Sequence, residues 1–419
     1  MRHGLMLFLF LMTSWSLTAQ DDINFADDVY LDYIESVKFH HSGLFTSIPI
    51  IDLGSNGRLI LSFDDLEAGD KDYIYKIIHC DKNWKPSDLD EYDYINGFNG
   101  EEIEDISYSI GTYENYTHYR LSLPNDDLEW TISGNYILAV YEDEYDTVPA
   151  ITRRFMVAEP LVTVLAQVDQ PMNVSKIRTH HEIDFKINFK NFRIVNAMNE
   201  IEVTILQNYR WDTAMKGIKP RFVSGENINF NYVDQINFPA GKEFRIVDLR
   251  STRYRGEGVH SIDRNANGID MLVQLDGNRF HKNYHTYDDI NGQFVIETAD
   301  DNRHNLESEY MNVYFALQLE QPILEGDIYI LGSFCDWKMT EENRLEYDSF
   351  RNIYSKDIHL KQGFYDYIYA IKRGDEVDYT GLEGNSFETE NNYTVLAYFT
   401  EFGARYDRLI GVASLNSGR

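Results

Sequence analysis

Few residue patterns in the chain could support chemistry, and the first is a broken zinc motif. His181 and Glu182 begin the metalloprotease pattern, but Phe185 stands where the second metal-binding histidine is required. His281 and His285 have the spacing of a helical metal clip, whereas on a strand they would lie about 13 Å apart, too far for one ion. The sequence also lacks a nucleophile elbow, a phosphate loop and a dinucleotide loop. We therefore predict no catalytic site, no cofactor and no small-molecule substrate.

A weak calcium candidate lies further along the chain. Asp263, Asn265 and Asn267 place oxygen side chains at alternate positions before Gly268, as calcium loops do. The twelfth position is Gln274, where such loops use a bidentate glutamate. Asn and Asp are also favoured in hairpin turns. Calcium binding and a plain hairpin both remain open.

Three arginines form a basic island in an acidic chain, namely Arg250, Arg253 and Arg255. They could be an outward strand face paired with nearby carboxylates. They could instead form a docking patch for an acidic partner, because clustered charge attracts its opposite.

The elements that must position these residues are strands. Apolar and polar residues alternate in residues 117–123, 183–189 and 311–319, which places one face of each segment on a core. Turn signals such as Pro124-Asn125-Asp126 and Asn291-Gly292 separate such runs. No long segment shows helical periodicity with caps at both ends. The pattern predicts an all-β protein of tandem immunoglobulin-like or E-set β-sandwich domains.

The domain boundaries follow changes in composition. Residues 153–157 read as a last strand, and Glu159-Pro160 as a short linker. The charged segment 300–309 precedes another strand at Met311. We expect a signal peptide at 1–19, an N-terminal sandwich at 20–158, a middle sandwich at 159–306 and a C-terminal E-set-like sandwich at 307–419.

Export is indicated by the N-terminus. Arg2 and His3 are followed by an apolar run from Leu5 to Met12, and small and polar residues then lead to Ala19. This order is typical of a secretory signal peptide cleaved before Gln20. The run is shorter than the roughly 20 residues that span a bilayer, so we predict no membrane insertion. Cys80 and Cys335 fall in different predicted domains and are expected to be free thiols.

Composition excludes some classes of partner. The formal charge is −31, which argues against nucleic acid and against anionic lipid, because both are bound through basic patches. Aromatic residues are abundant, with 30 Tyr and 24 Phe, and they favour strands. The sequence thus indicates an exported, acidic β protein.

The last predicted domain resembles a known module. The segment Ile328 to Trp337, followed by Gly363 to Ala370, looks like the glycogen-binding or isoamylase N-terminal type of sandwich. That resemblance implies Trp337 as a possible carbohydrate-stacking residue. A second interpretation makes Trp337 a packing anchor at a core or edge.

Several segments together resemble the plug protein family of the type IX secretion system, a group of Bacteroidota periplasmic β-sandwich proteins. The segments are His79–Ser87, Tyr116–Tyr119, Leu123–Asn125, Ser133–Tyr136, Gln207–Asp212, Asp248–Arg253, Glu388–Tyr393 and Arg405–Gly411. The resemblance extends from about Tyr30 to Gly411.

What the resemblance implies is a non-enzymatic role. Such a protein is expected to close the periplasmic opening of the type IX translocon, a giant outer-membrane β-barrel, as a soluble or peripherally bound periplasmic plug. Two alternatives stay open. A periplasmic carbohydrate-binding protein would need exposed aromatics around Trp337, and a glycosidase would need a cleft with two convergent carboxylates.

Overall fold

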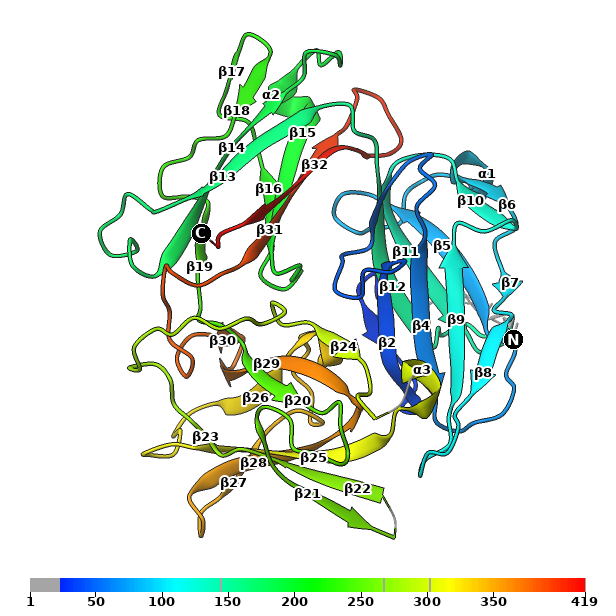
Figure 1. The fold of residues 1–419 in the computed structure, drawn as a ribbon. Coiled ribbons are helices and arrows are strands. Elements are labelled where there is room, and N and C mark those ends of the chain that lie inside the picture. Colours follow the sequence, from blue (N-terminus) through cyan, green and yellow to red (C-terminus); the bar gives the residue numbers. More distant parts are fainter. Residues whose placement is uncertain (1–22, 144, 267, 301–302, 419) are drawn as a thin grey trace, which may run out of the picture.

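The computed structural model describes residues 23–143, 145–266, 268–300 and 303–418. The predicted signal peptide, 1–19, lies outside the described residues. The described chain forms three β-sandwiches, which pack around a common centre (Figure 1). The predicted all-β class of tandem sandwiches is confirmed. The helices described are single short turns, and none has the length and apolar character that a membrane crossing requires.

The first sandwich comprises residues 23–158. One sheet has the order β1-β12-β11-β5-β7 with β3 beside β12, the other has the order β2-β4-β9-β8, and β10 pairs with β6 at one end. Its elements are β1 (Asp28–Val29), β2 (Ile34–His41), β3 (Ile50–Asp52), β4 (Leu59–Asp65), β5 (Ile74–Cys80), α1 (Glu91–Tyr94), β6 (Ile95–Gly97), β7 (Glu101–Glu102), β8 (Asp105–Tyr108), β9 (Thr117–Leu123), β10 (Leu128–Trp130), β11 (Gly134–Tyr141) and β12 (Ile151–Ala158).

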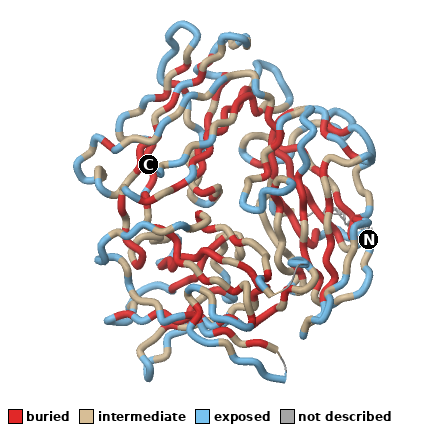
Figure 2. The backbone as a smooth tube through the Cα atoms, viewed as in Figure 1, coloured by how far each residue is buried: buried red, intermediate tan, exposed pale blue. Residues whose placement is uncertain are grey.

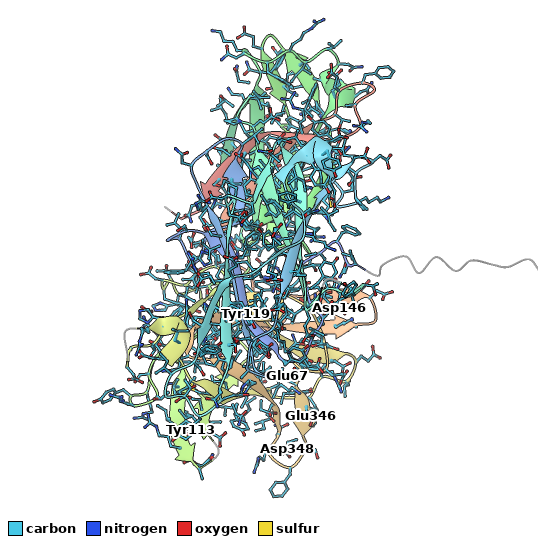
Figure 3. All side chains as sticks on the ribbon, turned by 90° about the vertical axis from the view of Figure 1, so that its right-hand side faces the viewer. Glu67, Tyr113, Tyr119, Asp146, Glu346 and Asp348 are labelled. Atoms are coloured by element: carbon cyan, nitrogen blue, oxygen red, sulfur yellow. The ribbon has the colours of Figure 1, made fainter. Side chains whose placement is uncertain are left out.

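The strand expected at 117–123 from alternation is β9, and its apolar members face inward, although Thr117 and His118 are buried as well. Tyr119, Leu121 and Leu123 point into the core, where Tyr119 stacks on Phe63 at 5.1 Å. Seen from the side, β9 runs down the middle of the molecule with Tyr119 near its centre (Figure 3). Aromatic side chains fill much of this core because each buries a large apolar area.

The second sandwich is built from two separate stretches of chain, 161–240 and 392–416. Its sheets have the orders β13-β14-β18-β17, with β19 beside β14, and β16-β15-β31-β32. Its elements are β13 (Thr163–Asp169), β14 (His180–Asn188), α2 (Ala197–Glu200), β15 (Ile201–Gln207), β16 (Met215–Ile218), β17 (Phe222–Ser224), β18 (Asn227–Asn229), β19 (Asn237–Pro239), β31 (Asn392–Phe399) and β32 (Arg408–Asn416).

The third sandwich, residues 244–383, is inserted between β19 and β31. Its sheets are β20-β29-β24, with β26 and β30 also on β29, and β21-β22-β25-β28-β27, with β23 beside β25. Its elements are β20 (Arg245–Asp248), β21 (Val259–Asn265), β22 (Gly268–Val273), β23 (Asp276–Gly277), β24 (Phe294–Ile296), α3 (His304–Glu307), β25 (Tyr310–Gln318), β26 (Asp327–Leu331), the 3-10 turn η1 (Ser333–Cys335), β27 (Glu346–Asp348), β28 (Ile353–Lys361), β29 (Gly363–Arg373) and β30 (Glu376–Asp378).

This insertion corrects the predicted boundary between 306 and 307. Val247 of β20 pairs with Tyr365 of β29, so residues on both sides of that boundary share one sheet. At the other end, Val395 of β31 pairs with Ile205 of β15, which returns the end of the chain to the second sandwich. The charged segment that suggested a linker contains α3, a surface turn of the third sandwich. Composition alone does not separate such a turn from a linker.

The insertion predicts the effect of truncation. Removing residues 392–419 deletes β31 and β32, half of a four-stranded sheet. The second sandwich should then lose protection from limited proteolysis, because β15 loses β31, one of its two partner strands, and part of its buried surface. Removing only residues 417–419, which follow β32, is the matched control and should leave the digestion pattern unchanged. Equal resistance of the two truncated chains would contradict the insertion.

Candidate functional site: the junctions between the sandwiches

The histidines singled out in the sequence do not meet. His181 is buried, with Nδ1 2.8 Å from Tyr393 Oη and Nε2 2.8 Å from the carbonyl of Phe387. His281 and His285 are exposed in a loop of the third sandwich. Among the described residues, no group of three or more His, Cys, Asp or Glu side chains is arranged to hold a metal. Cys80 and Cys335 are both free thiols, as expected.

The calcium candidate lies on a hairpin. Asp263 pairs with Asp270, and Asn265 pairs with Gly268, where β21 turns into β22. Asn265 Nδ2 also donates to Asp270 Oδ2 at 3.0 Å. Asn267 lies outside the described residues. The backbone thus forms the hairpin that the turn residues favoured, and calcium binding remains a prediction.

The basic island is tied to carboxylates of its own sandwich. Arg250 contacts Asp248 at 2.8 Å and Glu297 at 3.0 Å. Arg253 lies 4.0 Å from Asp300. Arg255 donates to the carbonyl of His260 instead. The local pairing expected for an outward face is present, and a docking role for the three arginines remains a prediction.

Trp337 lies between the second and third sandwiches. The guanidinium of Arg210, from the second sandwich, sits 4.1 Å from the centre of its ring, and Phe244 packs at its edge at 5.9 Å. Backbone at Gly292 approaches so closely that a Cβ there would come within 2.6 Å of the indole. Because a sugar needs a free aromatic face, this packing supports the anchor interpretation of Trp337.

The most extensive functional feature is a shared apolar layer between the first and second sandwiches. One face of the β5-β11-β12 sheet packs on one face of the β15-β31-β32 sheet, and Figure 2 shows buried backbone running through both. The fully buried members of this layer are Cys80, Trp84, Ile137, Ala139, Tyr141, Met156, Ala158, Leu206, Leu396, Tyr398 and Leu409. Tyr398 Oη donates to Asn135 Oδ1 at 2.8 Å, which satisfies its polar end inside the layer.

Segments that carried the sequence resemblance meet at the rim of this layer. Trp84 packs edge-on against Trp211 at 4.9 Å. Lys82 Nζ lies 3.3 Å from Asp407, and His79 contacts the ring of Tyr406 at 5.7 Å.

The contact at this rim requires a glycine at position 134. Its φ of +144° and its surroundings both require glycine, because a Cβ would lie 2.5 Å from His79 Nε2 and 3.1 Å from the carbonyl oxygen of Asp407. The close approach lets the start of β11 touch the second sandwich.

A buried ion pair joins the first sandwich to the third. Lys361 Nζ of β28 lies 2.5 Å from Asp64 Oδ2 of β4, and both side chains are 1% exposed. Tyr310 also donates to Asp64 at 2.7 Å, and His118 Nδ1 lies 2.7 Å from Oδ1 of the same carboxylate. Burial opposes ionisation of Asp64, but Lys361 and His118 outweigh it and lower the pKa of the carboxyl. Tyr116 completes the contact by donating to the carbonyls of Asn305 and Ser308.

Glu35 lies in the same junction beside a cavity of about 600 Å³ between the first and third sandwiches. Burial raises the pKa of Glu35 to about 8, and the nearby carboxylates of Glu342 and Asp64 add to the rise. Within the described residues, these junctions have the geometry of fixed contacts. They hold three sandwiches in one arrangement.

The shared apolar layer was not predicted from the sequence, although a signal was present. Residues 136–141 and 393–399 are nearly continuous apolar runs, and such runs are typical of strands buried on both faces. The Asp64–Lys361 pair had no local signal, because its residues are 297 positions apart.

Comparisons with known proteins agree with this architecture. A family model described as "Type 9 secretion system plug protein 1st domain" matches residues 34–159, which cover most of the first sandwich. A solved structure of a hypothetical protein from Parabacteroides merdae is similar over 94% of this chain and 100% of its own, with 32% sequence identity and a TM-score of 0.90. No curated protein matches the chain.

The buried pair predicts a large effect of Lys361→Met on stability. The change leaves Asp64 buried without its cation, which should lower the free energy of unfolding by about 3–5 kcal/mol in urea denaturation. The double variant Asp64→Leu/Lys361→Met removes both charges and should recover part of the loss, because Tyr310 and His118 lose Asp64 as their partner. Lys85→Met, at an exposed position, is the control. A loss no larger than that of the control would refute the assignment.

Glu35 predicts a pH dependence. Its folded pKa of about 8 lies above the roughly 4.3 of an unfolded glutamate, so the folded state alone holds a proton between these values and stability should fall as pH rises from 5 to 8. Glu35→Gln removes the proton, so the variant should gain stability relative to wild type across that range. Urea midpoints at pH 5, 7 and 9 measure this, with exposed Glu104→Gln as control. Curves that stay parallel for Glu35→Gln and wild type would contradict it.

Proposed function

We propose that the chain, whose residues 34–159 place it in the type 9 secretion system plug protein family, is a non-enzymatic periplasmic plug. It closes the periplasmic opening of the outer-membrane translocon of that system. Its place is the periplasm, free or held peripherally at the outer membrane through the translocon, and the predicted signal peptide at 1–19 supports this export.

The main support for the proposal is that the domain matched by the family model is joined to both other sandwiches through buried contacts. Residues 34–159 contribute one side of the shared apolar layer and one side of the Asp64–Lys361 contact. A pore that passes folded cargo leaks small solutes unless a folded body fills it. A stopper must keep its shape under thermal motion, and sandwiches joined through buried contacts do so without a ligand.

Release and rebinding also constrain the outer surface. An interface that forms and separates is more polar than an obligate one. The formal charge of −31 suits a polar, salt-sensitive contact with a barrel mouth that offers basic residues. The arginines at 250, 253 and 255 are a local exception to that charge and a candidate part of the contact.

A periplasmic carbohydrate-binding role is the second candidate. The resemblance of the third sandwich to a glycogen-binding module motivated it. The packing of Trp337 against Arg210 and Phe244 counts against it, because one ring face is already occupied.

Deletion of the gene tests the plug. The outer membrane should then admit larger solutes, measured as uptake of a fluorescent dye that wild-type cells exclude, because the leak runs through the open barrel. Re-expression of the wild-type chain should restore the barrier.

Deleting the translocon as well is the decisive control. The double deletion should be tight again, since the leak needs the barrel. Unchanged dye entry in the single deletion, or a leak that persists without the translocon, would contradict the proposal.

A further inference from the structure

The three sandwiches meet around a second cavity of about 330 Å³, within the size range of small-molecule sites. Each sandwich contributes to its wall. Lys38 of β2 and Arg154 of β12 come from the first, Tyr209, Trp211 and Lys216 from the second, and Trp337 from the third. The plug role assigns nothing to this cavity.

Three cations of the wall have no ion-pair partner. Among the described residues, no carboxylate oxygen lies within 4.0 Å of the charged nitrogens of Lys38, Arg154 or Lys216. Lys38 Nζ donates to the carbonyl of Phe294 at 2.9 Å, and Arg154 donates to the carbonyl of Phe25. Each also lies over an aromatic ring: Lys38 over Phe294 at 4.3 Å, Arg154 over Trp84 at 4.7 Å and Lys216 over Trp211 at 5.6 Å. The rings attract the cations but supply no counter-charge.

The carboxylates of the same wall are already engaged. Asp212 pairs with Arg210 at 2.5 Å, and Asp336 pairs with Arg153 at 3.2 Å. Asp27 Oδ1 accepts the backbone N–H of Arg154, and its charge partly offsets that of the Arg154 guanidinium. Burial and the charge of Arg153 lower the pKa of Lys38 to about 7, and the carboxylate of Asp336 opposes this only in part. Partial burial and the charge of Arg154 likewise lower the pKa of Lys216, although much of its side chain is exposed. Positive charge is therefore in excess, and an added anion would relieve it.

Buried polar groups of the wall also lack partners. Tyr209 Oη, Trp211 Nε1 and Ser333 Oγ are buried, and none makes a hydrogen bond to a described residue. Burial raises the pKa of Tyr209, and the neighbouring Trp211 indole opposes that rise. The contact between the two side chains does not have the geometry of a hydrogen bond. These atoms are covered by protein, so they make the wall polar but do not contact the cavity itself.

We propose that this cavity binds a small organic anion. Its carboxylate or phosphate lies among the charged nitrogens of Lys38, Arg154 and Lys216. Its apolar part lies along Trp211 and Trp337. Because all three sandwiches supply the wall, the bound anion stabilises their common arrangement.

Calorimetric titration of the full mature chain tests the site at constant ionic strength. The probes are phenyl phosphate, benzoate and uncharged benzyl alcohol. If only phenyl phosphate binds saturably, the cavity is a phosphate site. If only benzoate binds, it is a carboxylate site, and if both bind, it is a general anion site. Absence of saturable binding by either anion, or equal binding of benzyl alcohol, overturns the proposal.

Variants connect the binding to the wall. Lys216→Gln changes an exposed side chain and should weaken anion binding about tenfold or more, the usual effect of losing a charge-assisted hydrogen bond. Lys219→Gln is the matched control, since Lys219 pairs with Glu202 at 2.8 Å and does not line the cavity. Equal affinities of the two variants reject the site.

Proton uptake on anion binding tests whether Lys38 belongs to the site, and it needs no substitution. At pH 8 an arriving anion should raise the pKa of Lys38, so the protein takes up a proton that titrations in two buffers of different ionisation enthalpy reveal. Binding at pH 8 without proton uptake would remove Lys38 from the site and contradict the proposal as stated.

Discussion

The structure depends on one constraint, which is that two of its sheets are apolar on both faces. Strand β11 is buried at all eight positions, and β31 is buried at seven of eight. One face of each strand fills the core of its own sandwich, and the other face lies in the shared apolar layer. Neither sandwich could expose that second face to water without losing the free energy of its burial. The first and second sandwiches therefore fold as one body.

The position of the third sandwich follows from this pairing. Because β31 must pair with β15, the chain passes from the second sandwich into the third and back again through two neighbouring connections. They touch where the carbonyl of Gly241 accepts hydrogen bonds from the Ser386 backbone N–H and the Thr389 hydroxyl. Two connections restrict rotation more than one would. The Asp64–Lys361 contact then fixes its far side to the first sandwich. The closed arrangement creates the central cavity and gives the chain the constant shape that a stopper needs.

Much of the fold could be predicted from local patterns. The strand expected at 117–123 is β9, and the strand expected at 311–319 is β25 with a shift of one residue. Alternation reveals a strand and its inward face, but not its partner. The insertion of the third sandwich into the second was not predicted, because no local sequence pattern indicates that β20 pairs with β29 or that β15 pairs with β31. The cluster of Lys38, Arg154 and Lys216 was missed for the same reason, since only the tertiary fold brings these distant cations together.

The central claim is that the first and second sandwiches form one cooperative body through the shared apolar layer. Native-state hydrogen exchange at increasing urea tests it most directly. The amides of β11 and β31 should open with the same free energy and the same urea dependence, because neither strand can expose its outer face unless both sandwiches unfold. Exchange of β31 at a clearly lower free energy than β11 would mean that the sandwiches unfold independently, and would contradict the account.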